Sequence, residues 1–290
     1  MEEILRVENL CKNYPSFSLK NVTFSINAGE IMGFIGRNGA GKTTTLKSIM
    51  NLLHYDSGTI VAFGNDMKIY ELENKQRIGF ALSELNYYPN RTVKEMVSVT
   101  KKFYKDFDQA KFDKLAKLFN LDMKKKLEAL SSGMKVKFSL AIALSHSAEL
   151  LILDEPTSGL DPISRDEILD IFRSIVKDGE RAILFSTHIT SDLDKCATNI
   201  TYIQNGEVKF FGTKNDFVKS YLFVPKQNVP SEALSHFIAS KEYDDGVEGL
   251  IKAEDKKYMD TYQIETKEPD LEQIMVYLER SAKENESFTL

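Results

Sequence analysis

The chain has 290 residues, which predicts one large domain with an appendage, or two domains. Its 38 basic and 43 acidic side chains leave a net charge of −5, which gives no support to the strongly basic face that nucleic-acid binding requires, so we expect no nucleic-acid partner. No segment offers about 18 uninterrupted apolar residues, so a role at a membrane would need a separate membrane-spanning partner.

The first part of the chain is predicted to be rich in strands. Val22, Phe24 and Ile26 alternate with polar residues before a turn at 27–29, the pattern of a half-buried strand. Residues 30–35 then form a short apolar run that predicts a further strand. Residues 44–50 carry apolar side chains at helical spacing and predict a helix directly after it.

The segment between this strand and this helix carries the strongest chemical signal. Residues 36–43 fit the phosphate-binding loop pattern G-x-x-x-x-G-K-[ST] at every fixed position. Glycines there let backbone N–H groups crowd around anionic oxygens, while Lys42 can reach the β- and γ-phosphates and the Thr43 hydroxyl can ligate Mg²⁺. The sequence therefore predicts a nucleoside triphosphate site with these binding residues: Gly36, Asn38, Gly39, Ala40, Gly41, Lys42, Thr43 and Thr44.

Strands and helices alternate through the next part of the chain, around one helical block. Strands are predicted near 59–63 and 77–82, and residues 92–147 are predicted to be almost wholly helical, with many lysines. Alternating segments return at 150–153, 182–186 and 200–211. This order favours an α/β nucleotide-binding core with an inserted helical subdomain.

Two carboxylates follow a second apolar run. Residues 150–153 are all apolar, which favours a buried parallel strand, and Asp154 and Glu155 come directly after them. The carboxyl end of such a strand lies at the crevice where α/β sheets bind ligands. We therefore expect Asp154 to hold Mg²⁺ and Glu155 to polarise a water for attack on the γ-phosphate. By themselves, paired acids after a strand can also simply begin a turn.

Further motifs resemble one family. Residues 130–134, Leu-Ser-Ser-Gly-Met, resemble the signature sequence of ATP-binding cassette (ABC) proteins, usually written Leu-Ser-Gly-Gly-Gln, and occupy the same place in motif order. Residues 156–161 resemble the family's D-loop, which ends at Asp161. His188 resembles its switch histidine, and Tyr14 resembles the aromatic that stacks on adenine. The resemblance covers about residues 1–220.

This resemblance implies a fold and a division of the chain. The expected class is α/β, with a P-loop NTPase core of ABC type, an antiparallel β-subdomain, an inserted helical subdomain and a small C-terminal α/β appendage. The cassette would span residues 1–220, with its helical subdomain at about 84–148, and residues 221–290 would form an accessory domain. In that accessory part, residues 249–253 predict a strand and residues 271–278 a helix, or else the chain ends in a flexible tail.

The resemblance also assigns site roles. It implies ATP and Mg²⁺ as cofactors, catalytic roles for Glu155 and His188, and nucleotide contacts across a dimer from residues near the signature and D-loop: Ser131, Ser132, Gly133 and Asp161. The alternatives are purely structural roles: Ser131 would be an ordinary helix cap, and His188 would only support the fold. Phe17 is the nearby rival of Tyr14 for the adenine ring.

The sequence departs from the family pattern at two places. Ser83 stands where the family usually has the metal-ligating Q-loop glutamine, so Ser83 is the predicted third metal ligand, with Glu84 as the substitute. Ser132 and Met134 replace Gly and Gln of the signature. Such variants resemble those of bacterial export cassettes for drugs, lantibiotics and amphipathic peptides.

The expected function is that of an ATP-hydrolysing subunit of a bacterial membrane exporter. It would pair with a second cassette, identical or different, and with a transmembrane permease, at the cytoplasmic face of the membrane. Two other readings remain open at this point: a soluble cassette protein acting on ribosomes or nucleic acid, and a non-hydrolytic ATP-binding module. Aromatic residues after Ser83 would either dock the permease or pack within the helical subdomain: Tyr87, Tyr88, Phe103, Tyr104 and Phe107.

Overall fold

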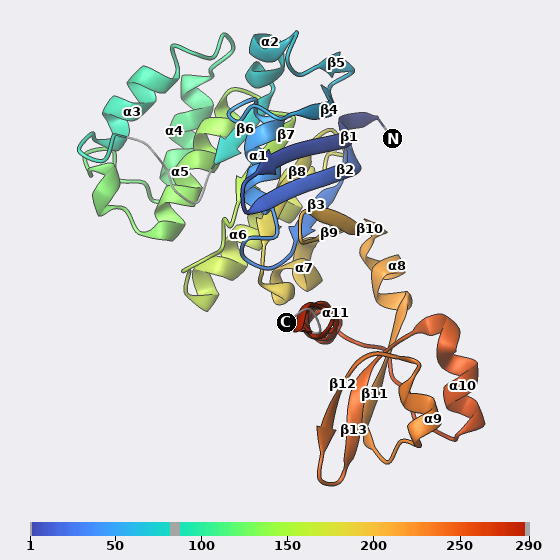
Figure 1. Ribbon diagram of the computed structural model, residues 1–290. Helices are drawn as coiled ribbons and strands as arrows, with labels where there is room; N and C mark the ends of the chain where they lie inside the picture. Colours follow the sequence, from blue (N-terminus) through green and yellow to red (C-terminus); the bar gives the residue numbers. More distant parts are fainter. Residues whose placement is uncertain (1, 82–87, 288–290) are drawn as a thin grey trace. The chain divides into compact units, whose positions relative to one another are not determined.

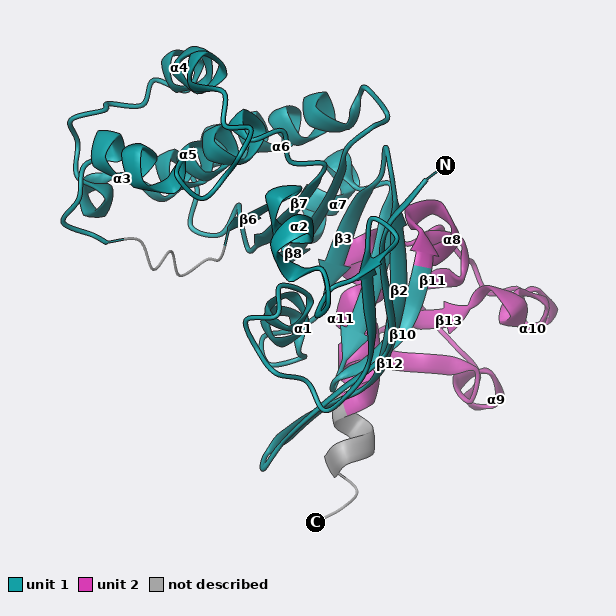
Figure 2. Ribbon diagram, turned by 90° about the horizontal axis from the view of Figure 1, so that it is seen from above, with its two compact units in different colours: residues 1–211 teal, residues 212–290 magenta. Residues whose placement is uncertain are grey.

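The computed structural model describes residues 2–81 and 88–287. The chain divides into two compact units, residues 1–211 and 212–290 (Figure 2). The sequence-based division after residue 220 falls between α8 (Lys214–Lys219) and β11 (Tyr221–Gln227). Among the described residues, no helix combines the length and the apolar character needed to cross a bilayer.

An antiparallel sheet forms the first layer of unit 1. Its strand order is β2-β1-β4-β5, with β1 (Glu3–Tyr14), β2 (Phe17–Asn27), β4 (Ser57–Ala62) and β5 (Asn65–Asp66). Val7 of β1 lies opposite Phe24 of β2 and Ile60 of β4, and all three side chains are buried. The predicted alternation in β2 is confirmed, because one face of this sheet packs into the core.

The core sheet of unit 1 has six strands in the order β10-β9-β3-β8-β7-β6 (Figure 1). Its strands are β3 (Ile31–Ile35), β6 (Ile78–Ala81), β7 (Leu150–Asp154), β8 (Ala182–Thr187), β9 (Asn199–Gln204) and β10 (Glu207–Thr213). Every residue of β3, β7 and β8 is buried, which explains why these strands are apolar up to the polar residues that end β7 and β8. The parallel register sets Ile35 beside Thr187 and Asp154 beside Ser186, so the carboxyl ends of these neighbouring strands lie level.

Helices of unit 1 pack against this sheet and against one another. The helix α1 (Lys42–Ile49) contacts β7, and α6 (Pro162–Val176) contacts β3 and β8. The short α7 (Thr190–Cys196) packs on α6, and α2 (Glu71–Gln76) packs on β6. The helix predicted at 44–50 is thereby confirmed, beginning two residues earlier at Lys42.

The helical block is less continuous than predicted. It consists of α3 (Val93–Thr100), α4 (Gln109–Leu118), a short 3₁₀ helix (Leu127–Ala129) and α5 (Ser132–Ser145), which gather at one side of unit 1 in Figure 1. The prediction of almost unbroken helix over 92–147 was wrong. Capping side chains of Thr92, Asp108 and Ser131 each start a new helix. Residues that connect the helices, such as Phe119 and Leu121, are buried as well, so the apolar pattern indicated burial and not one continuous helix.

Unit 2 is a small α/β unit of its own. Its antiparallel sheet has the order β11-β13-β12, with β12 (Phe237–Tyr243) and β13 (Gly246–Lys252), and α11 (Leu271–Ser287) packs on both of these strands. The strand and the helix predicted near 249–253 and 271–278 are confirmed in β13 and α11. Two further helices, α9 (Ser231–Leu234) and α10 (Lys256–Thr261), contribute Ala233 and Met259 to its core.

Candidate functional site

The phosphate loop joins the end of β3 to the start of α1. Two of its glycines occupy positions where a side chain would be strained or would clash. Gly41, the residue before α1, has a φ of 113°, a backbone conformation that glycine adopts readily and that residues with a side chain rarely adopt. A Cβ on Gly36 would lie 2.3 Å from the carbonyl oxygen of Ile203 in β9. The loop therefore wraps closely around the helix start, with backbone approaching backbone.

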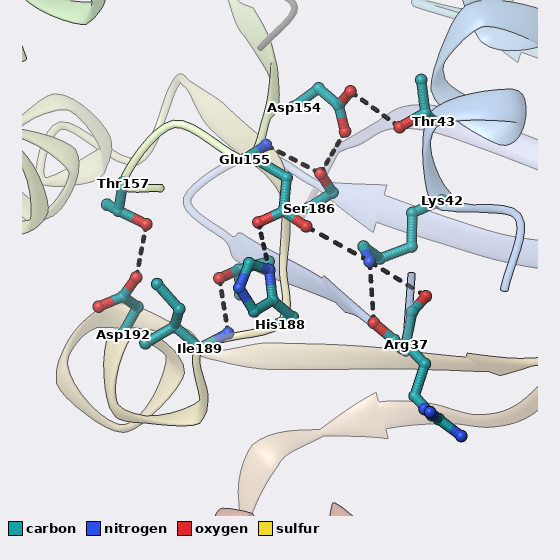
Figure 3. Close-up of polar contacts among 12 residues, drawn as sticks. Arg37, Lys42, Thr43, Asp154, Glu155, Thr157, Ser186, His188, Ile189 and Asp192 are labelled. Carbon is teal, nitrogen blue, oxygen red and sulfur yellow. Dashed lines mark hydrogen bonds and ion pairs between the residues drawn. The ribbon is translucent and has the colours of Figure 1, made fainter. Parts of the chain in front are cut away.

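Lys42 is folded back into this loop. Its side chain is 6% exposed, and Nζ donates to the carbonyl oxygens of Gly36 at 2.8 Å and Arg37 at 3.3 Å. The same Nζ forms an ion pair with Oε1 of Glu155 at 3.3 Å (Figure 3). An ammonium group has three donors, and three oxygens of this chain surround this one.

Asp154, at the end of β7, is held between two hydroxyl groups. Thr43 Oγ1 donates to Oδ2 at 2.9 Å, and Ser186 Oγ donates to Oδ1 at 2.5 Å (Figure 3). Sequence reasoning did not identify Ser186; its signal was a polar residue directly after the apolar run of β8. The carboxylate and the Thr43 hydroxyl are hard oxygen donors that fit Mg²⁺. Ser83, the third predicted metal ligand, and Glu84, its substitute, lie outside the described residues.

Glu155 connects three distant parts of the sequence. Its φ of 50° is unusual for a residue with a side chain and costs about 1–3 kcal/mol. Two hydrogen bonds from its N–H, to the hydroxyl and the carbonyl oxygen of Ser186, hold this turn. Its Oε1 forms the ion pair with Lys42, and Oε2 lies 2.8 Å from Nδ1 of His188 (Figure 3).

A pocket of about 460 Å³ opens at this cluster. It is lined by Ser16, Phe17, Arg37, Asn38, Gly39, Gly41, Lys42, Thr43, Thr44 and Glu155. Phe17 reaches it from the start of β2, whereas Tyr14 is not among the described lining residues and lies with its ring 5.4 Å from Lys12 Nζ. Stacking of Tyr14 on adenine stays a prediction, and the structure places the rival Phe17 at the pocket.

The residues of the signature and the D-loop lie at two other helix starts. Ser131 caps α5 by accepting from the N–H of Met134 at 3.3 Å, and both Ser131 and Ser132 are exposed. Asp161 caps α6, and hydrogen bonds from the side chain and backbone of Ser164 lower the pKa of its carboxyl group. Gly133 is buried, and a Cβ on it would lie 3.4 Å from Leu160, which precedes α6 by two residues. Within the described chain, none of these residues lines the pocket.

The described aromatic residues after Ser83 separate into two groups. Tyr104 stacks on His146 with ring centroids 3.7 Å apart, and Phe107 lies against Phe112, so both pack within the helical block. Tyr88 and Phe103 are exposed, at 71% and 70%. Tyr87 lies outside the described residues.

Comparison with known proteins places these motifs in a family context. A family model described as "ABC transporter" matches residues 19–158, and a model of an AAA domain matches residues 126–193. The bacitracin transport ATP-binding protein of Bacillus licheniformis is 34% identical over 72% of this chain and 69% of that protein. The linearmycin resistance ATP-binding protein of Bacillus subtilis is 34% identical over 73% of this chain and 70% of its own length. A Nod factor export ATP-binding protein of Burkholderia orbicola is also 34% identical, over 73% and 71%.

Solved structures agree with this placement. An ATP-binding subunit of an ABC transporter superimposes with a TM-score of 0.66 at 28% identity, over 73% of this chain and 91% of that one. A dimeric ATP-binding cassette in a post-hydrolysis state with ADP and Pi shares the fold, with a TM-score of 0.65 at 22% identity over 72% of this chain and 98% of that one.

Proposed function

This chain belongs to the ATP-binding proteins of ABC transporters, which hydrolyse ATP for transport, and we propose that it works as a Mg²⁺-dependent sandwich dimer driving export through a separate transmembrane subunit. The observation that carries the proposal is the position of Glu155. Its carboxylate lies between Lys42 of the phosphate loop and His188 after β8, beside the hydrogen-bonded pair of Asp154 and Thr43 (Figure 3).

The first proposed step is an exchange of partners at Lys42. Its ammonium group is bonded to two loop carbonyls and to Glu155. Phosphate oxygens entering the loop would attract Lys42 more strongly than the single carboxylate does, because they carry more charge. Lys42 would then release Glu155, which keeps its contact with His188. Nucleotide entry would in this way free the carboxylate that hydrolysis requires.

Glu155 then serves as the general base. Its free oxygen would accept a proton from a water aimed at the γ-phosphate, while His188 holds the other oxygen through Nδ1 and orients the carboxylate. The other ring nitrogen of His188, which is exposed, can meet the phosphate or the attacking water. Mg²⁺ held by Thr43 and Asp154 would supply neutralisation of the phosphate charge.

A second cassette would complete each site. Ser131 and Ser132 are exposed at the positive end of α5 and do not line the pocket of their own chain. Their donors are therefore available to a γ-phosphate presented by another subunit. Hydrolysis would remove that γ-phosphate and let the dimer reopen. The second cassette can be identical to this chain or a different one.

The transmembrane partner is proposed to dock near the exposed Tyr88 and Phe103, at the cytoplasmic face of the membrane. The exported substrate is proposed to be an amphipathic, antibiotic-like molecule. Two relatives are named for bacitracin transport and linearmycin resistance, which supports this class.

Replacing Glu155 with Gln tests the proposal. Loss of a general base costs about 10²–10⁴-fold in rate, so ATPase turnover should fall by that factor, while ATP should bind at least as tightly because a neutral amide competes less for Lys42. ATP-loaded dimers should accumulate and elute earlier in size-exclusion chromatography. The matched control is Glu149→Gln, at the opposite end of β7, where Glu149 pairs with Arg77 and touches no site residue named above. Unchanged turnover in Glu155→Gln would remove Glu155 from the role of base.

A further inference from the structure

A second, buried contact lies beside the Glu155–His188 pair. Thr157 follows Glu155 by two residues, and Asp192 in the first turn of α7 follows His188 by four. Thr157 Oγ1 donates to Asp192 Oδ2 at 2.6 Å, and both residues are fully buried (Figure 3). The two segments that carry Glu155 and His188 are thus joined twice.

The buried carboxylate of Asp192 is costly to maintain. Burial raises its pKa, against the hydrogen bond from Thr157 and the charge of Arg165. Arg165 of α6 has its Nε 3.8 Å from Asp192 Oδ1, and within residues 2–81 and 88–287 neither of these two atoms has a hydrogen-bond partner. An apolar pair of similar size would remove this cost. The arrangement therefore calls for an explanation other than stability.

Two contacts between the same pair of segments restrict their relative movement more than one contact does. The contact between Glu155 Oε2 and His188 Nδ1 alone would let the two segments pivot about it. The contact between Thr157 and Asp192 adds a second fixed point in the same pair of segments, and Arg165 attracts Asp192 from a third element. The backbone of Glu155 is already fixed by Ser186. His188 is exposed and follows β8 in a short connection to α7, so its position depends on how α7 is held.

We propose that Thr157 and Asp192 are positioning residues that hold Glu155 and His188 in the mutual geometry that ATP hydrolysis needs. This inference deepens the proposed function and rests on the roles given there to Glu155 and His188. Neither residue touches the nucleotide pocket, so the effect is on turnover and not on ATP affinity.

Thr157→Val tests the bond, because it removes the hydroxyl with almost no change in volume. Misplacement of reacting groups by about 1 Å costs up to about a hundredfold, so kcat should fall by about ten- to a hundredfold with KM for ATP unchanged. Thr157→Ser keeps the hydroxyl and should restore kcat to within about threefold of wild type. A wild-type kcat in Thr157→Val, or a fall that Thr157→Ser does not reverse, would overturn the inference.

Asp192→Ser breaks the same contact from the other side without leaving an unpaired buried carboxylate. Because it also removes the attraction of Arg165, it should lower kcat at least as much as Thr157→Val. Combining Thr157→Val with Glu155→Gln should lower kcat no further than Glu155→Gln alone, because Thr157 acts through Glu155. Additive losses would overturn the inference. If Glu155→Gln itself kept full turnover, the proposed function would fail; if only Thr157→Val kept it, the positioning role alone would fail.

Discussion

The phosphate loop and the start of α5 are both helix N-termini assigned to the same nucleotide, and they are built in opposite ways. In the loop, Lys42 is buried, and backbone oxygens and Glu155 of the same chain meet its charge. At α5, Ser131 and Ser132 are exposed, and the Ser131 hydroxyl accepts a hydrogen bond as a helix cap. The charge of the loop is therefore met within the chain, whereas the proposed role of α5 requires a second subunit to bring a phosphate to it.

The largest effect is expected at the buried half. Lys42→Ala removes hydrogen bonds to charged phosphate oxygens worth about 1.5–3 kcal/mol, so ATP should bind about ten- to a hundredfold more weakly. A fluorescence titration with a labelled nucleotide measures this. Lys47→Ala, in the last turn of the same helix and away from the pocket lining, is the matched control and should bind normally. Normal affinity in Lys42→Ala would contradict the assignment of the phosphate loop.

A substitution at the exposed start of α5 should impair dimerisation and leave the monomer unaffected. Ser132→Arg would force a bulky side chain into the interface with the second subunit, and such overpacking costs about 1–3 kcal/mol, which weakens ATP-driven dimerisation about five- to a hundredfold. ATP binding to the monomer should stay unchanged. Analytical ultracentrifugation of the Glu155→Gln background with ATP measures the dimer. Ser98→Arg, at an exposed position of α3, is the control. Dimers that persist in Ser132→Arg would place the cross-subunit contact elsewhere.

The smallest effect separates the two roles open to Ser131. Loss of its cap on α5 should lower the free energy of unfolding by about 1 kcal/mol in Ser131→Ala, as measured by urea denaturation. Ser98→Ala, where no cap is lost, should change it little. A cap alone would leave turnover per folded molecule unchanged, whereas a nucleotide contact would lower it as well. An unaltered unfolding free energy would show that the cap contributes nothing.

The residues of the motifs were predictable, because their types and their local backbone conformation are encoded in the same short stretch of sequence. Gly36 to Thr43, Asp154 and Glu155 lie at the ends of apolar strands, where parallel sheets expose functional groups. Ser186 was missed because its role comes from the register of β8 against β7, which no local pattern reports. The contact of Thr157 with Asp192 was missed for the same reason, since 35 residues separate the two.

The helical block shows the opposite failure. Its apolar spacing correctly predicted helices, but Asp108, Asn120 and Ser131 divide it into shorter pieces. Apolar residues in the intervening turns pack into the same core, so spacing alone does not distinguish helix from buried turn. Likewise Tyr14 and Phe17 are equal as aromatics in the sequence, and only the pairing of β1 with β2 brings Phe17 to the pocket.

Residue types and their local spacing already predicted the chemical groups of the site: a glycine loop and its lysine, two carboxylates after a buried strand, and a histidine after another. These depend on residue type and on spacing within one element, which local backbone preferences control. The contacts that these groups make with one another emerge only from the folded chain. Lys42 and His188 flank Glu155, Ser186 bridges Asp154 and Glu155, and Thr157 reaches Asp192, because strand register and helix packing set distances that sequence separation does not contain.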